Sequence, residues 1–499
     1  MAVMATTEAP NIPAVSVREW IQGVIKQDEI DRYLKDDKCF IDEAQIWRHL
    51  EQNANPDPAR IKDIIAKSRA LHRLEPDETA ALLHCTDEDL WQEIYETGLQ
   101  IKQEVYGRRI VFFAPLYVAN LCVNNCAYCG YRSENEAIVR GALTMDGLRD
   151  EVRALVSKGH KRLIMVYGEH PCSDADYIAE TIRTAYETKV DNGEIRRVNI
   201  NAAPLSIEDF AKLHEVGIGT YQVFQETYHR PTYERLHPQN TLKGNYLWRL
   251  YALHRAQEAG IDDVAIGALI GLYDYRFEVM GLLMHAIDLE ERFDGVGPHT
   301  ISFPRLEPAV NTPWLENPQY KVADDQFKKL VATIRLSVPY TGMILTCREN
   351  PQLRRDVMMV GCTQLDAGSN IAIGGYAAEQ EAGEKQQFML SDNRSLDEVI
   401  HELAQMGMIT SFCTAGYRCG RTGEYFMKIA KAGKVHCMCM PNAILTFQEY
   451  LEDYASPETK AIGAKLVQEE LERLPVAELR EHVKGLLNRV KAGERDLYI

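Results

Sequence analysis

The apolar residues of this chain follow two spacings, and the change between them divides the sequence. From Ser16 to about Gly107 they recur at helical intervals among charged residues, as in DPARIKDIIAKSRALHRL and DEDLWQEIYETGLQIKQEVYG. Asp87 is a suitable N-cap for the second of these helices, and Gly107 is a suitable stop. We therefore expect a helical N-terminal extension over residues 16–107, preceded by a disordered tail over residues 1–15.

From Ile110 onward the pattern changes to short β-branched runs that alternate with amphipathic stretches such as TMDGLRDEVRALVSKG and YLWRLYALHRAQEAG. The strand candidates are IVFFAPLYV, RLIMVYG, RRVNINAA, TYQVFQET, DVAIGALIGL, HTISFPR, GMILTC and TQLDAG. Eight strands separated by helices predict an α/β fold, a parallel (β/α)8 TIM-type barrel over residues 108–375. In a barrel of this kind the chemistry lies at the C-terminal ends of the strands. Residues 376–499 are expected to form a helical C-terminal domain with a cysteine-rich region.

The first strand of the predicted barrel runs into a cysteine loop, CVNNCAYCGY. Cys122, Cys126 and Cys129 are separated by three residues and then by two. Three thiolates hold three irons of a [4Fe-4S] cluster and leave the fourth iron open. A structural zinc loop or three reduced core cysteines are the alternatives, although zinc needs a fourth ligand close by and none follows at a usual interval. The spacing, with Tyr128 before the last cysteine, resembles the radical S-adenosylmethionine (SAM) superfamily, in which the open iron binds SAM and a 5'-deoxyadenosyl radical is made.

Polar residues follow several of the other predicted strands. Glu169 ends the second strand, where a carboxylate can accept a charge-assisted hydrogen bond from the SAM amine. Asn201 and Glu226 end the third and fourth strands and suit ribose hydroxyls. Arg305, with Ser302, ends the sixth strand, and a fixed guanidinium there suits bidentate capture of a carboxylate. The alternatives are a solvated Glu, satisfied structural polar residues, and an Arg paired to a nearby Glu.

Composition narrows the partners and the compartment. The chain has 73 acidic and 56 basic residues, a formal charge of -17, which argues against nucleic acid or an anionic membrane as partner. No apolar run reaches a membrane span. The N-terminal MAVMATTEAPNIPAVS lacks a charged start and an apolar core, so we expect a polar tail and not a signal peptide. Twelve cysteines, many of them clustered, favour metal binding over disulfides and a reducing cytoplasm as the location.

Longer segments make the resemblance more specific. The segments are YGEHP, QETYHRPTYERLHP, GLYDYRFEVMGLLMHAIDLE, GPHTISFPRLEPA, TQLDAGSNIAIGGY and CMPNAILTFQEYLEDY. From about residue 60 to about residue 455 the chain resembles the HydG family of radical SAM tyrosine lyases. The resemblance implies cleavage of the Cα–Cβ bond of L-tyrosine to p-cresol and dehydroglycine, for ligand synthesis in [FeFe]-hydrogenase maturation. It also implies a reducing electron donor such as ferredoxin or flavodoxin, and contact with hydrogenase maturation proteins.

Residue roles follow from the same resemblance. The three loop cysteines would hold the SAM cluster, with Tyr128 near adenine and Glu169 at the SAM amine. Arg305 and Ser302 would hold the tyrosine carboxylate. His285, in GLLMHAID, is a candidate ligand for the extra iron at the family's second site. The alternative for His285 is a packed, hydrogen-bonded residue on an apolar helix.

The C-terminal cysteines depart from the family pattern. HydG proteins hold a second cluster on Cys-x2-Cys-x22-Cys, but here Cys413 and Cys439 flank Gly416 in the middle position. Either Cys419 substitutes, giving Cys413, Cys419 and Cys439 as ligands, or the site is degraded and the enzyme stops at dehydroglycine instead of making CO and cyanide. Cys437 is a further thiol nearby, and four cysteines within 27 residues favour a second cluster.

Two rival functions remain open at this point. One is a lyase for tyrosine or another aromatic amino acid that releases dehydroglycine for a different pathway. The other, of a different class, is an iron-sulfur scaffold that delivers metal without turning over SAM. The intact cysteine loop, with Glu169 and Arg305 at strand ends, argues against the scaffold.

Overall fold

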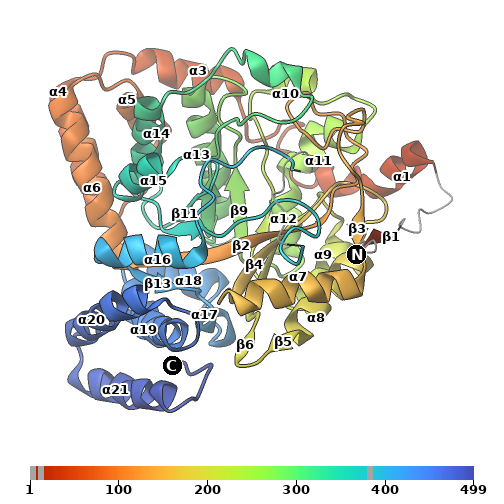
Figure 1. The fold of residues 1–499 in the computed structure, drawn as a ribbon. Helices are drawn as coiled ribbons and strands as arrows, with labels where there is room; N and C mark the ends of the chain where they lie inside the picture. Colours follow the sequence, from red (N-terminus) through yellow and green to blue (C-terminus); the bar gives the residue numbers. More distant parts are fainter. Residues whose placement is uncertain (1–6, 9–15, 379–385) are drawn as a thin grey trace.

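Eight parallel strands close into a barrel at the centre of the molecule (Figure 1). The computed structural model describes residues 7–8, 16–378 and 386–499. Each barrel strand pairs with the next, and the last strand pairs with the first, which closes the ring. The strands are β2 (Arg109–Ala119), β4 (Arg162–Tyr167), β7 (Arg197–Asn201), β8 (Tyr221–Gln222), β9 (Val264–Gly267), β10 (Thr300–Ser302), β11 (Gly342–Leu345) and β12 (Gln364–Asp366). The predicted (β/α)8 fold is confirmed, and every predicted strand segment overlaps one of these strands.

Helices cover the outside of the barrel because each presents one apolar face to it. In α7 the residues Leu148, Val152 and Leu155 recur at helical spacing and are fully buried. Thr144 caps this helix by accepting a hydrogen bond from the Gly147 amide. The outer helices are α7 (Met145–Ser157), α8 (Ala175–Glu187), α9 (Ile207–Glu215), α10 (Arg230–Leu236), α11 (Tyr246–Leu250), α12 (Ala252–Glu258), α13 (Tyr275–Arg292), α14 (Asp324–Ser337) and α15 (Pro351–Met358), with 3-10 turns at Leu242–Gly244 and Pro313–Glu316.

The N-terminal part is helical, as its spacing predicts. Its helices are α1 (Val17–Val24), α2 (Asp28–Asp31), α3 (Glu43–Gln52), α4 (Pro58–Arg69), α5 (Pro76–Leu83) and α6 (Glu88–Tyr106). Asp87 caps α6 and Gly107 ends it with a φ of 69°, both as expected from the sequence. The predicted tail lies outside the described residues except for β1 (Thr7–Glu8), which pairs antiparallel with β3 (Ala142–Leu143).

The C-terminal part packs on the end of the barrel where the strands begin. Its strand β13 (Ile409–Ser411) pairs in parallel with the first residues of β2, so that Ile409 lies beside Arg109. Its helices are α16 (Leu396–Gln405), α17 (Ala415–Arg418), α18 (Gly423–Lys431), α19 (Val435–Asp453), α20 (Pro457–Arg473) and α21 (Ala477–Lys491). In Figure 1 these blue helices gather below the barrel. One hydrophobic core runs continuously from the N-terminal helices through the barrel to α19.

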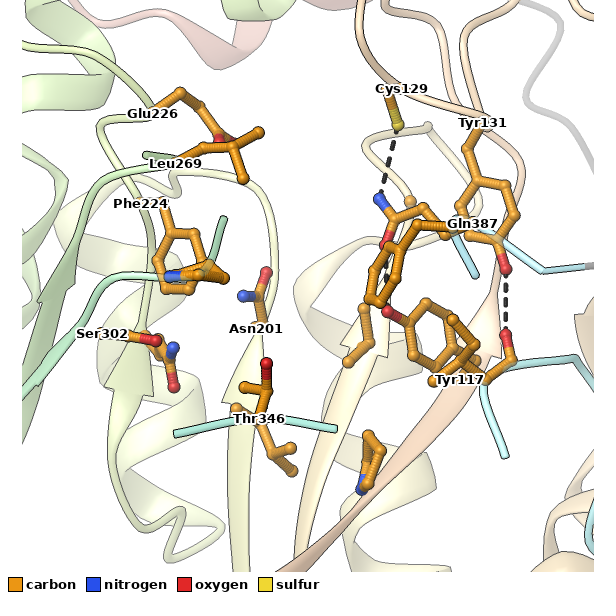
Figure 2. A pocket seen from close by; sticks show the side chains of 18 of the residues that line it. Tyr117, Cys129, Tyr131, Asn201, Phe224, Glu226, Leu269, Ser302, Thr346 and Gln387 are labelled. Carbon is orange, nitrogen blue, oxygen red and sulfur yellow. Dashed lines mark hydrogen bonds between the residues drawn. The ribbon is translucent and has the colours of Figure 1, made fainter. Parts of the chain in front are cut away.

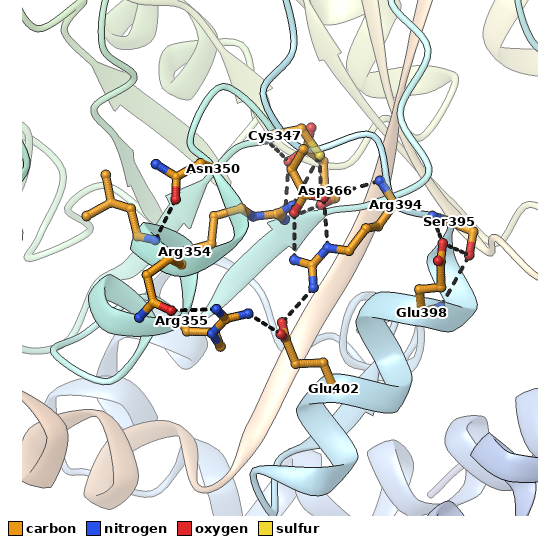
Figure 3. Close-up of polar contacts among 12 residues, drawn as sticks. Cys347, Asn350, Arg354, Arg355, Asp366, Arg394, Ser395, Glu398 and Glu402 are labelled. Atoms are coloured by element: carbon orange, nitrogen blue, oxygen red, sulfur yellow. Dashed lines mark hydrogen bonds and ion pairs between the residues drawn. The ribbon is translucent and has the colours of Figure 1, made fainter.

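A network of ion pairs fastens the segment after the barrel to its last strands (Figure 3). Arg354 pairs with Asp392 and donates to the Asp366 carbonyl at 2.5 Å. Arg394 pairs with the same Asp392 at 2.7 Å and with Glu402 on α16 at 2.9 Å. The network places residues 387–390 at the C-terminal ends of the strands. Outside the barrel, β5 (Lys189–Val190) pairs with β6 (Gly193–Glu194) in a short antiparallel hairpin. No helix in the described part of the chain is long and apolar enough to span a membrane.

Candidate active site

A cavity of about 220 Å³ opens at the C-terminal ends of the barrel strands. Its walls combine the cysteine loop after β2 with side chains from the ends of the strands around the ring, and with Gln387 and Phe388 from the segment after the barrel (Figure 2). The position agrees with the rule that parallel barrels carry their chemistry at this end. Of the predicted site residues, the three loop cysteines, Tyr128, Glu169, Asn201, Glu226 and Ser302 all line this cavity.

The three thiols of the loop share one wall of the cavity. The Asn124 side-chain amide donates to Cys122 Sγ at 3.6 Å, and the Gln387 amide donates to Cys129 Sγ at 3.4 Å. Burial raises the pKa of Cys122 to about 11 and raises that of Cys126 as well. Amide donors aimed at sulfur are the surroundings that cluster thiolates have. The donor set therefore fits an iron-sulfur cluster.

Among the described residues no three His, Cys, Asp or Glu side chains converge closely enough to hold a single metal ion.

Next to the thiols lies a buried network of charges. Glu169 accepts from Arg249 Nη1 at 2.7 Å and from the Asn124 amide at 2.7 Å. Glu226 accepts from Lys243 Nζ at 2.5 Å and lies 3.5 Å from Arg249 Nη2. Burial alone would raise the pKa of Glu169, but Arg249 and Lys243, together with the hydrogen bonds from Arg249 and Asn124, lower it below its ordinary value. Glu169 is therefore a carboxylate held in a fixed orientation.

Sequence reasoning missed three members of this network, Asn124, Lys243 and Arg249. Asn124 lies inside the cysteine loop and was overlooked because cysteines were the signal there. Lys243 and Arg249 lie in TLKGNYLWRL, whose helical spacing conceals that one side of the segment faces the cavity. These two residues could have been found as a pair of cations six residues apart in the segment that follows the fourth strand and Glu226.

Tyr128 closes an apolar part of the cavity. Its ring packs with Leu236, Leu269 and Leu272 in a separate hydrophobic cluster. Its hydroxyl lies 2.8 Å from Nε2 of the buried His237, which satisfies the polar end of the side chain. A flat apolar surface beside the cysteine loop suits the face of a planar ring such as adenine.

The sixth strand behaves differently from the prediction for its arginine. Arg305 pairs with Glu349, with Nε 3.0 Å from Oε1, and with Asp324 at 2.9 Å. It is absent from the cavity wall, whereas Ser302 lines the wall with its buried Oγ free of any partner among the described residues. On this side of the barrel the arginine that lines the cavity is Arg348, which follows the seventh strand.

Arg348 was missed by sequence reasoning. Its guanidinium carbon lies 3.4 Å from the centre of the Phe388 ring, and its Nη1 donates to the Arg305 carbonyl at 3.2 Å. Among the described residues Arg348 forms no ion pair with a carboxylate, and its side chain lines the cavity. Glu307 also lines the cavity, and burial raises the pKa of its carboxyl to about 7.

The C-terminal cysteines lie apart from this cavity. Cys413 and Cys439 line a smaller cavity of about 20 Å³ together with Gly416 and His299. Cys419 lines no cavity described for this chain, and its Sγ lies 3.9 Å from the Ile499 carbonyl. In this structure Cys419 therefore lies apart from the cavity that Cys413 and Cys439 share, and its role as third ligand stays a prediction.

His285 does not approach these cysteines either. It is buried on α13, where its Nδ1 lies 2.9 Å from the Tyr228 hydroxyl and its ring stacks on that of His254. It lines neither cysteine cavity. The histidine that lines the cavity of Cys413 and Cys439 is His299. Sequence reasoning missed it because it precedes its strand, whereas the candidate residues were sought after the strands.

Comparison with known proteins agrees with this geometry. The model of the radical SAM superfamily matches residues 116–283, and that of the biotin and thiamin synthesis associated domain matches residues 302–409. The 2-iminoacetate synthase of Salmonella typhimurium is 30% identical over 378 residues, which is 74% of this chain and 95% of that protein.

Two solved structures are similar over most of the chain. A crystal structure of HydG, described as a maturase of the [FeFe]-hydrogenase, is 50% identical, covers 92% of this chain and 100% of its own, and superposes with a TM-score of 0.89. The maturase HydG from Carboxydothermus hydrogenoformans is 36% identical, covers 93% of this chain and 99% of its own, and has a TM-score of 0.77.

Proposed function

Because this chain belongs to the HydG family of radical SAM proteins, we propose that it cleaves the Cα–Cβ bond of L-tyrosine to p-cresol and dehydroglycine. The observation that carries the proposal is one cavity with two differently equipped walls. One wall holds Cys122, Cys126 and Cys129, and the wall from the later strands holds Ser302 and Arg348. The first set suits a cluster and the second suits an amino-acid carboxylate.

The cysteine wall would hold a [4Fe-4S] cluster and SAM, which when bound supply a 5'-deoxyadenosyl radical. Glu169 then accepts a hydrogen bond from the SAM amine, in the orientation that Arg249 and Asn124 fix. Tyr128 and its leucine neighbours take the adenine face. Asn201 and Glu226 line the same cavity and accept the ribose hydroxyls.

The other wall orients the substrate. The unpaired fork of Arg348 binds the tyrosine carboxylate, and the free hydroxyl of Ser302 adds a donor beside it. Arg305 positions this site by its carbonyl, which accepts from Arg348, and by its pairing with Glu349. Glu307, with its raised pKa, takes the proton that the substrate ammonium must lose before hydrogen abstraction.

The test is an anaerobic assay with reconstituted protein, SAM, a strong reductant and L-tyrosine. We expect p-cresol and 5'-deoxyadenosine in equal amounts, and neither from a variant with Cys122, Cys126 and Cys129 all changed to Ala. Cys172→Ala, which removes a thiol outside the loop, serves as the control and is expected to retain activity.

Two results would contradict the proposal in different ways. Cleavage of SAM with L-tryptophan in place of L-tyrosine as substrate would point to another aromatic amino-acid lyase. No reductive SAM cleavage with any amino acid would favour the non-catalytic iron-sulfur scaffold. Electron supply by ferredoxin or flavodoxin stays a prediction. Conversion of dehydroglycine to CO and cyanide for hydrogenase maturation depends on whether the C-terminal cysteines hold a second cluster.

A further inference from the structure

The C-terminal thiols lie at the opposite end of the barrel from the cavity that holds the cysteine loop. β2 joins the two places, because its first residue, Arg109, lies beside the thiols and its last leads into the loop. The strand has 11 residues, so its ends are roughly 33 Å apart at the usual rise of an extended chain. The two sites are therefore separate, and each must be judged on its own ligands.

Two thiols meet at the C-terminal site. Cys413 follows β13 with a left-handed backbone (φ 49°), and Cys439 lies in the second turn of α19. Both line the cavity of about 20 Å³, and both line a neighbouring one of about 10 Å³ on the side of Arg109. Each cavity has room for about one water molecule.

The third position belongs to Gly416, which lines both cavities between the two thiols. A Cβ built on it would meet a single atom within 4 Å, the Arg421 Cβ at 3.9 Å. Its φ is not in the left-handed region, so a cysteine fits there without backbone strain. The space for a third thiolate exists, and the chain supplies none to it.

The two other nearby thiols are directed elsewhere. Cys419 Sγ contacts the Ile499 carbonyl, which also accepts from Arg421 at 2.7 Å and from Asn442 at 2.9 Å. Cys437 is exposed and lies against the ring of its neighbour His436. Bringing Cys419 to the third position would separate its turn from these contacts with the Ile499 carbonyl.

The guanidinium of Arg109 is buried beside the two thiols. Arg109 is 3% exposed, and its Nε and Nη1 have no hydrogen-bond partner among the described residues. Arg109 lines the smaller of the two cavities together with Cys413 and Cys439. A guanidinium is a cation with donors only, so it cannot take the place of a third thiolate ligand.

We infer that the C-terminal site carries no cluster on three protein thiolates, and that Gly416 alone is the reason. A consequence for the reaction product follows, and it rests on the proposed lyase activity. Without a second cluster, dehydroglycine leaves the enzyme unconverted. In water its C=N bond hydrolyses, one water adding and ammonia leaving, to glyoxylate. The reaction that uses it must add a nucleophile to the imine carbon before water does.

The test counts iron and sulfide after anaerobic reconstitution. We expect about four irons per chain for the native sequence and about eight for Gly416→Cys. In a background with Cys122, Cys126 and Cys129 changed to Ala, we expect no cluster, and about four irons once Gly416→Cys is added. Gly485→Cys, which adds a thiol on the exposed face of α21, is the matched control and is expected to add none.

Three outcomes would overturn the inference. The first is about eight irons in the native protein, of which four are lost in Cys413→Ser. The second is the same loss of four irons in Cys419→Ser. The third is a Gly416→Cys variant that still forms p-cresol but binds no more iron than the native protein. Formation of p-cresol measured in parallel tests the lyase proposal separately, because it depends on the first cluster alone. Glyoxylate and ammonia without CO or cyanide are the products expected from the native protein.

Discussion

Glu169 and Arg249 form a buried ion pair at 2.7 Å directly beside the thiol of the first loop cysteine, through the amide of Asn124. The same amide nitrogen reaches Glu169 Oε2 and Cys122 Sγ, so one side chain ties the carboxylate to the cysteine loop. Any ligand held by the loop therefore meets a carboxylate whose direction is already set. Preorganisation of this kind lowers the cost of ordering the site on binding.

The first prediction concerns the charge of Glu169. Glu169→Gln keeps the shape but leaves Arg249 with Glu226 at 3.5 Å as its remaining carboxylate partner. Removing one partner of a buried ion pair costs about 3–5 kcal/mol. We expect a lower free energy of unfolding in denaturant titrations and loss of SAM binding in equilibrium dialysis. Glu134→Gln, an exposed change in the same loop region, is the control, and equal SAM binding by both variants would refute the role.

A second prediction separates the two arginines. Arg348→Lys replaces the fork at the cavity by a point charge, and we expect the KM for tyrosine to rise about 10- to 100-fold because charge-assisted hydrogen bonds worth about 1.5–3 kcal/mol are lost. Arg305→Lys breaks the pairing with Glu349 and should reduce thermal stability more than it raises KM. Steady-state kinetics and thermal melts of both variants decide this. If Arg305→Lys raised the KM for tyrosine more than Arg348→Lys does, Arg305 would be the residue that binds the tyrosine carboxylate, as predicted from the sequence.

These two arginines show why the fold was predictable and part of the site was not. Alternating short apolar runs and amphipathic helices predict parallel strands with crossover helices, because that arrangement buries both, and eight such strands favour a closed barrel. An arginine at a strand end carries no such constraint. Arg305 turns away because Asp324 and Glu349, 19 and 44 residues later, are there to pair with it. Glu349 and Arg348 are neighbours in the turn after β11, where Glu349 pairs with Arg305 and Arg348 lines the cavity.

At the C-terminal site, too, the sequence predicted the position of the site but not all of its contacts. The motif positions of Cys413, Gly416 and Cys439 were readable from spacing, and the structure brings all three to one cavity. Whether Cys419 replaces the missing thiol depended on where its turn docks, which is decided by Ile499 at 80 residues' distance. No local pattern in the sequence contains that information.

A third prediction addresses the hydrogen bond from Gln387 to Cys129. An N–H aimed at a cluster sulfur stabilises the added electron of the reduced state, so Gln387→Leu should lower the reduction potential. A bond worth about 1 kcal/mol corresponds to roughly 40 mV for one electron. Potentiometric titration followed by electron paramagnetic resonance measures it. Tyr117→Phe, which removes the 2.9 Å bond that orients Gln387, should give a smaller shift in the same direction, and a rise in either variant would contradict the assignment.

The last prediction uses the raised pKa of Glu307. Its carboxyl ionises near pH 7 because burial disfavours the charge, with Glu349 adding repulsion and Arg348, Arg305 and Lys321 opposing it. If Glu307 removes the proton of the substrate ammonium, only its ionised form is active. The rate of p-cresol formation under saturating tyrosine should therefore rise as the pH increases through about 7, from protonated and inactive below to ionised and active above.

Glu307→Gln removes this titration without changing the size of the side chain. We expect kcat to fall about 100-fold or more, in the range that general base catalysis contributes, with the rise near pH 7 abolished and the KM for tyrosine little changed. Glu316→Gln, a partly exposed carboxylate in the 3-10 turn that follows, is the matched control and should keep the native profile. If Glu307→Gln kept the native pH profile, the proton of the substrate ammonium would have to leave by another route. In that case Glu307 would only support the fold, and its replacement would change the stability but not the pH at which the rate rises.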